Sequence, residues 1–207
     1  MQKYNIKKHD EIIKKMPRPY LSWSQLNMWE KDPNLYYQVY FEGLDQFRTK
    51  YLELGTRMAT ALENGFDAEN DPMMEMMLIY MPTYQIKEFD IKENFEDIPL
   101  FGKLDGFDVN NLIVGEYKSG KKWTQSMVDN HSQLTFYAFL VWLKYKVLPK
   151  QIFLHWAQTY EDENGILKLT GHIQTFQTER KLKDIILLSK RIKIAWKGIQ
   201  ELAQTFN

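Results

Sequence analysis

Apolar residues recur every three or four positions along the C-terminal quarter of the chain. Over residues 179–204 they form one stripe, and lysines occupy the opposite face. This period is typical of an α-helix with one buried face, so the segment predicts a long terminal helix. A solvated lysine face is the favoured interpretation, and contact with a DNA backbone is the alternative. The stripe contains Ile185, Leu188, Ile192, Ala195, Ile199 and Leu202, and the lysines are Lys183, Lys190 and Lys197.

Three further helices are predicted from starting signals and from apolar content. Ser22 and Gln25 have capping-box spacing, so a helix is expected to begin there. Residues 48–66 are predicted to be helical, with Gly65 near their end and Leu52, Met58, Leu62 and Phe66 as apolar positions. Residues 125–146 predict one long helix that begins with a Ser126–Asp129 capping box. Its second half is apolar nearly all round and is therefore expected to be buried.

The remaining patterns indicate strands and one methionine-rich segment. Strands are predicted over 84–95, 99–118, 151–160 and 167–176, and the second of these segments, 99–118, is expected to fold on itself as a hairpin. Strands alternating with helices give an α/β fold, a mixed central sheet flanked by helices. The methionine-rich stretch 71–81 is expected to pack in the core or to form a lid, with partner binding as the alternative.

The centre of the 99–118 segment fixes the register of a hairpin. Asn110 and Asn111 tolerate positive φ, so a two-residue type I′ turn is expected there. Folding the chain about this turn pairs Phe107 with Val114 and places further pairs on the same face. These further pairs are Asp105 with Glu116 and Lys103 with Lys118.

Two opposed carboxylates beside an apolar layer are unstable without a positive partner. Like charges that face each other across strands repel, and burial increases the cost. A hard divalent cation such as Mg²⁺ or Mn²⁺ would remove the conflict through oxygen ligands. The alternative is a surface hairpin in which the two lysines neutralise Asp105 and Glu116.

Composition narrows the remaining possibilities. The 207 residues contain 27 basic and 27 acidic side chains, so net charge gives no argument for nucleic acid or membrane binding. The absence of cysteine excludes disulfides, thiolate zinc sites and an iron–sulfur cluster. Residues 1–19 are a basic N-terminal arm, either solvated or in contact with phosphates, and 20–207 are expected to be a single domain. With no signal peptide and no apolar run long enough to span a bilayer, the protein is expected to be soluble and cytoplasmic, in a bacterial or phage-infected cell.

Four sequence blocks follow one another along the chain: Leu21–Trp29, Leu54–Glu63, Gly102–Lys118 and Gln133–Ala138. In this order they resemble the PD-(D/E)xK nuclease superfamily, in particular the branch of the RecB nuclease domain and the CRISPR adaptation nucleases. Leu21–Trp29 is similar to the SxSxLxxF-type first helix of that branch, and Leu54–Glu63 is similar to its GTxxHxxLE helix. The third block is the hairpin, Gly102–Lys118. Gln133–Ala138 is similar to the QLxxYA motif. The resemblance implies a restriction-endonuclease-like core.

The resemblance also implies roles for individual residues. Asp105 and Glu116 would bind the metal, and the Tyr117 carbonyl would complete its ligands. Lys118 would orient or activate the attacking water and stabilise charge on the scissile phosphate. Gln133 and Tyr137, one helical turn apart, would position the phosphate or support Lys118.

One departure concerns a metal ligand. The branch usually has a metal-binding histidine where this chain has Ala59. Glu63 lies one turn further along the same predicted helical face and could supply an oxygen ligand instead, or it could be a solvated helix acid. The substitution implies a weaker metal site, a changed metal preference or lost activity.

These observations lead to a ranked set of functions. The first is a Mg²⁺- or Mn²⁺-dependent DNA nuclease in recombination, repair or viral DNA processing, with exonuclease action implied only by the resemblance. The chain has no P-loop, so any helicase or recombination protein would be a separate partner. The second is a catalytically inactive module that binds DNA ends or a partner protein. The third is an unrelated α/β domain with a chance hairpin.

Overall fold

The structure is a computed structural model that describes residues 16–45 and 49–205. Most of the basic arm expected over 1–19 therefore lies outside the described residues, and its role stays a prediction. Helices and strands alternate as the sequence patterns indicate. In chain order the elements are β1 (Leu21–Ser22), α2 (Trp23–Lys31), α3 (Pro33–Tyr40), α4 (Lys50–Asn64), α5 (Pro72–Tyr80), β2 (Ile86–Phe95), β3 (Ile98–Asp108), β4 (Ile113–Gly120), α6 (Gln125–Asp129), α7 (Ser132–Tyr145), β5 (Gln151–Glu161), β6 (Leu167–Thr178) and α8 (Leu182–Thr205).

The strands form one mixed sheet, which confirms the α/β prediction. The order is β1-β3-β4-β5-β6, and β2 pairs with β3. β1 is parallel to β3 and β4 is parallel to β5, whereas the β2–β3, β3–β4 and β5–β6 pairs are antiparallel. The two-residue strand β1 is too short to give a sequence signal and was not predicted.

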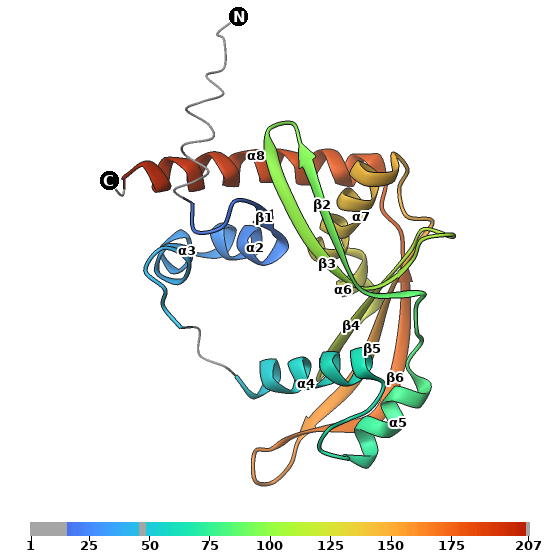
Figure 1. The fold of residues 1–207 in the computed structure, drawn as a ribbon. Coiled ribbons are helices and arrows are strands. Elements are labelled where there is room, and N and C mark those ends of the chain that lie inside the picture. The colour runs from blue at the N-terminus through green and yellow to red at the C-terminus, as the bar shows by residue number, and fades with distance from the viewer. Residues whose placement is uncertain (1–15, 46–48, 206–207) are drawn as a thin grey trace, which may run out of the picture.

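Helices cover the sheet from two sides. α7 packs on β2, β3 and β4 and also contacts α8, while α4 and α5 pack on β4 and β6. In Figure 1, α8 crosses one end of the molecule beside α2, and α4 and α5 lie at the other end. No helix in the described part of the chain combines the length and the apolar content needed to cross a membrane.

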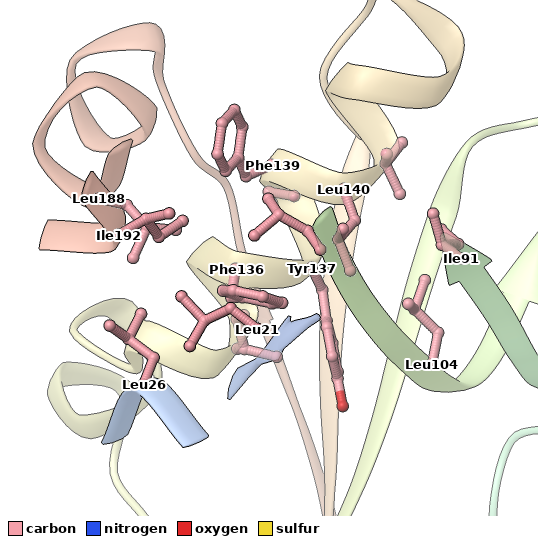
Figure 2. Close-up of a cluster of buried hydrophobic side chains, with 14 of the residues drawn as sticks. Leu21, Leu26, Ile91, Leu104, Phe136, Tyr137, Phe139, Leu140, Leu188 and Ile192 are labelled. Carbon is pink, nitrogen blue, oxygen red and sulfur yellow. The ribbon is translucent and has the colours of Figure 1, made fainter. Parts of the chain in front are cut away.

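The larger core lies between the sheet, α7 and α8. The second half of α7 is buried, as predicted, and its side chains meet those of α2, β2, β3 and α8 (Figure 2). The α8 stripe is buried at five of its six predicted positions, and Leu202 is partly buried against the same core. Removal of this apolar surface from water is the main force holding the layers together.

A second, smaller core lies under α4 and α5. Met74, Met77 and Met81 are buried there against Met58 and Leu62 of α4, which confirms the core-packing prediction for the methionine-rich segment. Unbranched, flexible methionine side chains fit the irregular space between two short helices and a sheet.

Local capping follows the sequence signals at two helices. The Ser22 hydroxyl accepts a hydrogen bond from the Gln25 amide at 3.4 Å, as the capping box requires. α4 ends where predicted because Gly65 has φ +81°, a left-handed C-cap. Of the four apolar positions named for the predicted helix, Met58 and Leu62 are buried, whereas Leu52 and Phe66 are 51% and 58% exposed.

The predicted helix over 125–146 is two helices. The Thr124 hydroxyl caps α6, the chain breaks at Asn130, and α7 begins after His131, so the predicted Ser126–Asp129 capping box is wrong. Arg180 fixes the break by donating to the carbonyl oxygens of Val128 and His131 at 3.0 and 3.2 Å. In a continuous helix these two carbonyl oxygens would accept from backbone amides, whereas here Arg180, far away in sequence, donates to them. No local sequence pattern could have predicted this break.

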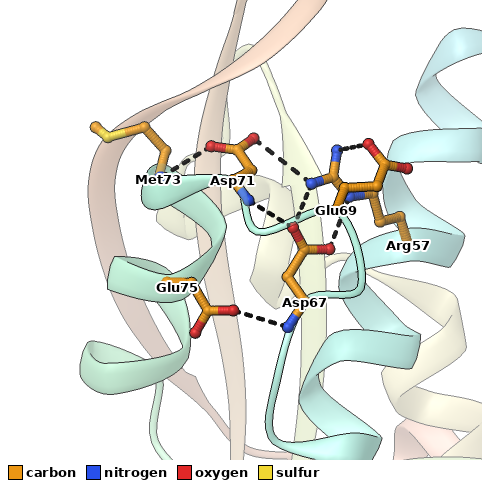
Figure 3. Close-up of polar contacts among 6 residues, drawn as sticks. All are labelled: Arg57, Asp67, Glu69, Asp71, Met73 and Glu75. Atoms are coloured by element: carbon orange, nitrogen blue, oxygen red, sulfur yellow. Dashed lines mark hydrogen bonds and ion pairs between the residues drawn. The ribbon is translucent and has the colours of Figure 1, made fainter.

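A network centred on Arg57 holds the connection between α4 and α5 (Figure 3). The Arg57 guanidinium binds both oxygens of the buried Asp67, with Nε 2.9 Å from Oδ1, and reaches the exposed Glu69 at 2.8 Å. Asp67 also accepts from the Asp71 amide at 2.9 Å. Because Arg57 lowers the pKa of Asp67 to about 2, this carboxylate is charged at neutral pH.

Asp67→Ala is expected to destabilise the protein by about 3 kcal/mol, because it removes the partner of a charged, partly buried arginine and of a backbone amide. Glu69→Ala is the matched control. It removes another carboxylate paired with Arg57, one that is solvent-exposed, so its cost should stay within about 0.5 kcal/mol. Urea unfolding of the two variants measures the difference, and equal costs would contradict the structural role of Asp67.

Candidate active site

The hairpin register is confirmed although the predicted turn is wrong. Phe107 pairs with Val114 and Gly106 with Gly115, as expected. The connection is longer than two residues, because pairing begins at Asp108 and Ile113. The positive φ belongs to Leu112, at +51°, and to neither asparagine. The Asp108 carboxylate accepts from the amides of both asparagines at 3.0 Å and so replaces the type I′ turn.

A fork in the sheet creates the candidate site. On one edge β3 pairs with β1 at Leu100 and Phe101 and then with β4 from Gly106 onward. Within the described structure, residues 102–105 have no ladder partner on this edge, because β1 and β4 diverge there. Asp105 lies at the mouth of the fork, and its Oδ2 accepts from the Tyr117 amide at 2.8 Å. The backbone groups released by the fork are thus partly satisfied by the candidate metal ligand itself.

Asp105 and Glu116 meet as predicted. Glu116 is 1% exposed, and its Oε2 is buried without a hydrogen-bond partner. Burial, and next the charge of Glu116, raise the pKa of Asp105 to about 8. At neutral pH the pair therefore resists carrying two negative charges, which is the conflict that the sequence register implied.

Lys118 forms an ion pair with Glu116 Oε1, and its side chain is 28% exposed. Burial disfavours its charge, but Glu116 and Asp105 outweigh burial and raise the pKa of Lys118. The lysine is therefore a cation at neutral pH. Lys103, predicted to lie opposite Lys118, instead pairs with Glu88 at 3.2 Å, because the β3–β4 ladder stops before reaching it.

A small pocket opens beside Asp105 on the side of α4. Its volume is about 20 Å³, room for one water-sized species. Ala59 and Glu63 line it together with Asp105 and Tyr117, so Ala59, where the resemblance implies a histidine, does lie in the same pocket as the Asp105 carboxylate. Glu63 is exposed, and its role as a ligand stays a prediction.

The donor set fits a divalent cation in part. A buried carboxylate oxygen without a partner, next to a second carboxylate with a raised pKa, is a chemical match for a hard cation. In the described residues, however, no three aspartate, glutamate or histidine side chains converge closely enough to hold a metal ion. The side chains present supply two carboxylates at the fork, and further ligands would come from backbone, water or substrate.

Gln133 and Tyr137 lie together on α7, with the Gln133 amide donating to the Tyr137 hydroxyl at 2.8 Å. Tyr137 is buried, and burial followed by the charges of Glu116 and Asp105 raises its pKa. The structure thus brings Tyr137 within the electrostatic reach of the carboxylate pair. What the two residues bind stays a prediction.

The sequence analysis missed Glu88 of β2. It lines the same pocket as Asp105, and burial is the main cause of its raised pKa. The predicted strand over 84–95 contained it, but only the antiparallel β2–β3 register places it beside Asp105.

A tyrosine sets the shape of the sheet at the fork. Tyr84 lies over Gly106 and Gly115, and a Cβ at either glycine would overlap its ring. The Tyr84 hydroxyl shares a 2.6 Å hydrogen bond with His155 Nε2. Gly106 directly follows Asp105 in β3 and Gly115 directly precedes Glu116 in β4, so both glycines are required for the close approach of this ring beside the carboxylate pair.

Comparison with known proteins finds solved structures with a similar fold. No protein-family profile matches the chain, and no curated protein sequence matches it. Among solved structures, a candidate exonuclease from Eubacterium rectale has a TM-score of 0.59 at 11% identity, with 99% of this chain and 88% of that chain covered. A phage-related exonuclease from Haemophilus somnus has a TM-score of 0.50 at 12% identity, with 82% and 80% covered. At these identities the likeness establishes a shared fold.

Proposed function

We propose that the protein is a divalent-metal-dependent DNA nuclease of the PD-(D/E)xK type, in the branch of the RecB nuclease domain. The observation that carries the proposal is the meeting of the half-buried Asp105 with the buried Glu116, whose Oε2 has no hydrogen-bond partner, beside the cationic Lys118. The exonuclease names of the two structural neighbours support the same reaction class.

Asp105 and Glu116 would hold Mg²⁺ or Mn²⁺, with the Tyr117 carbonyl and Glu63 as further ligands. When bound, the ion would lower the pKa of a coordinated water and neutralise charge that develops on the phosphate. The chain's own groups prepare this role: Asp105 is positioned by the Tyr117 amide at 2.8 Å, and Glu116 by its pair with Lys118.

Lys118 would act on the phosphate as a positive charge. Its raised pKa keeps it protonated, so it would stabilise an anionic transition state and orient water by donating hydrogen bonds, without removing a proton itself. Tyr137, held by Gln133, would donate to the phosphate or to Glu116 from the α7 side.

The substrate and partners follow from the reaction class. We propose DNA as the substrate and exonuclease action as its mode, in recombination, repair or viral DNA processing. A helicase or a recombination protein would act as a separate partner.

A second candidate is a nuclease-fold module without chemistry that binds DNA ends or a partner protein. Ala59 in the pocket and the lack of three converging metal-binding side chains among the described residues favour it. It predicts DNA binding that does not depend on metal.

The test uses end-labelled single- and double-stranded DNA with Mg²⁺, Mn²⁺ or EDTA. We expect cleavage with either metal and none in EDTA. An Asp105→Ala protein purified in parallel should be inactive, which controls for contaminating nuclease. DNA retention in gel shifts with no cleavage under any metal would favour the second candidate.

A further inference from the structure

Glu88 occupies the same level of the sheet as the two candidate metal ligands. In the β2–β3 register, Lys87 pairs with Gly106 and Phe89 pairs with Leu104. Glu88 lies between these two β2 residues and Asp105 lies between their two β3 partners, so the register sets Glu88 opposite Asp105. The β3–β4 register, continued by one step beyond Gly106 and Gly115, sets Asp105 opposite Glu116. Three carboxylates from three neighbouring strands therefore stand in one row.

Pairing is interrupted at this row on both sides of Asp105. Glu88 and Asp105 are not ladder partners although their neighbours are, and the β3–β4 ladder ends one step earlier. Glu88 has φ +50°, a left-handed conformation that costs a non-glycine residue about 1 kcal/mol. An acidic side chain in such a backbone position, beside two other acids, is unfavourable unless something positive binds there.

The strand segment that carries Glu88 is fastened beside the pocket by its neighbour Lys87. The Lys87 ammonium donates to the Leu62 carbonyl oxygen at 2.7 Å and to that of Glu63 at 3.4 Å, which fastens β2 to the end of α4. Glu88 lines the small pocket together with Asp105 and Ala59. The Glu88 carboxylate thus lies in the wall of the same pocket in which Ala59, the position where the resemblance implies a histidine, lies beside Asp105.

A lysine occupies the positive position in the structure as described. Lys103 Nζ lies 3.2 Å from Glu88 Oε2, and the Lys103 side chain is half exposed. This pair engages one oxygen of Glu88, and among the described residues three carboxylates do not converge closely enough to hold a metal ion. Meanwhile the buried Glu116 Oε2 has no hydrogen-bond partner, because Lys118 pairs with the other oxygen, Oε1.

We infer that Glu88 is the third carboxylate of the cation site, that it compensates for Ala59, and that it exchanges Lys103 for the cation when Mg²⁺ or Mn²⁺ binds. The inference rests on the proposed function, since it adds a ligand to the site of Asp105 and Glu116. Lys103 then acts as a stand-in charge that the cation displaces from Glu88.

Mn²⁺ affinity, measured by loss of the free-ion EPR signal without DNA, tests the assignment directly. Glu88→Gln should weaken Mn²⁺ binding roughly ten-fold, within the range seen when a metal site loses a supporting group. Glu93→Gln is the matched control: it lies on the same strand, has a lysine partner, Lys144, and is 26% exposed against 23% for Glu88. Equal affinities of the two variants would overturn the inference.

Lys103 gives a second, independent readout. Lys103→Gln should tighten Mn²⁺ binding, because the Glu88 carboxylate is then released from its ion pair with Lys103 and is free to bind the cation. If Lys103 acts through Glu88, adding Lys103→Gln to Glu88→Gln should change the affinity little. Tightening of the same size in both backgrounds would show a general charge effect and would contradict the exchange.

Failure of the inference differs from failure of the proposed function. Loss of Mn²⁺ binding in Asp105→Asn, with full binding in Glu88→Gln, would leave the two-carboxylate metal site standing and remove Glu88 from it. No Mn²⁺ binding by the unaltered protein would overturn both.

Discussion

Lys118→Ala is expected to lower the rate of metal-dependent DNA cleavage by at least about 100-fold. Removal of one preorganised positive or hydrogen-bonding group from a developing anion costs roughly 10²–10³ in rate in other enzymes. Lys118 is the cation paired with Glu116 at the fork, so the alanine removes this positive charge from beside the carboxylate pair. Single-turnover cleavage of end-labelled DNA in saturating Mn²⁺ measures the chemical step without a contribution from product release.

Two controls separate this role from structural damage. Lys121→Ala removes a lysine three residues along the chain that is 61% exposed and paired with Glu161, and it should leave the rate nearly unchanged. Lys118→Arg keeps the charge but changes its geometry, so intermediate activity is expected. Cleavage by Lys118→Ala at the rate of Lys121→Ala would rule out Lys118 as a catalytic residue.

Much of the fold was predictable because its signals are local and repeated. The period of the α8 stripe, the apolar second half of α7 and the Ser22 cap each depend on residues within a few turns of one another. The Asp105–Glu116 contact was predictable for a related reason: the Phe107–Val114 pairing transmits the register to the next pair on the same face.

The features that were missed depend on competing or distant groups. The Asn110–Asn111 turn is a sound local expectation, but the Asp108 carboxylate captures both asparagine amides and moves the positive φ to Leu112. The break between α6 and α7 depends on Arg180, some fifty residues away in sequence. Glu88 could have been found by aligning the strand over 84–95 antiparallel to β3, although no turn signal fixes that register as one does for β4.

Asp105→Asn should have opposite effects on stability with and without metal. In the metal-free protein the pKa of Asp105 is about 8, against an ordinary value of 3.8, because the carboxyl is buried next to Glu116. The folded state therefore holds a proton that the unfolded state has released, and stability falls as pH rises from about 4 to about 8. Replacing the Asp105 carboxyl group with an amide should remove this fall in stability with rising pH. In EDTA the variant is expected to be more stable than the unaltered protein by a few kcal/mol at pH 8.5 and by little at pH 4.

With Mn²⁺ the unaltered protein should become more stable than Asp105→Asn. Binding to the folded state alone stabilises it by about 2.7 kcal/mol at one hundred times the dissociation constant, and the unaltered protein should show this gain as a higher melting temperature. Asp105→Asn should show almost none, because the amide cannot supply the negative oxygen at the fork. Asp90→Asn, an exposed acid on β2, is the control and should respond to pH and Mn²⁺ like the unaltered protein. Two results together would contradict this prediction: equal melting temperatures of Asp105→Asn and the unaltered protein at pH 8.5 in EDTA, and an equal rise of both melting temperatures with Mn²⁺. The carboxylate pair would then be neither strained nor a metal site, and the hairpin would be a salt-bridged surface element.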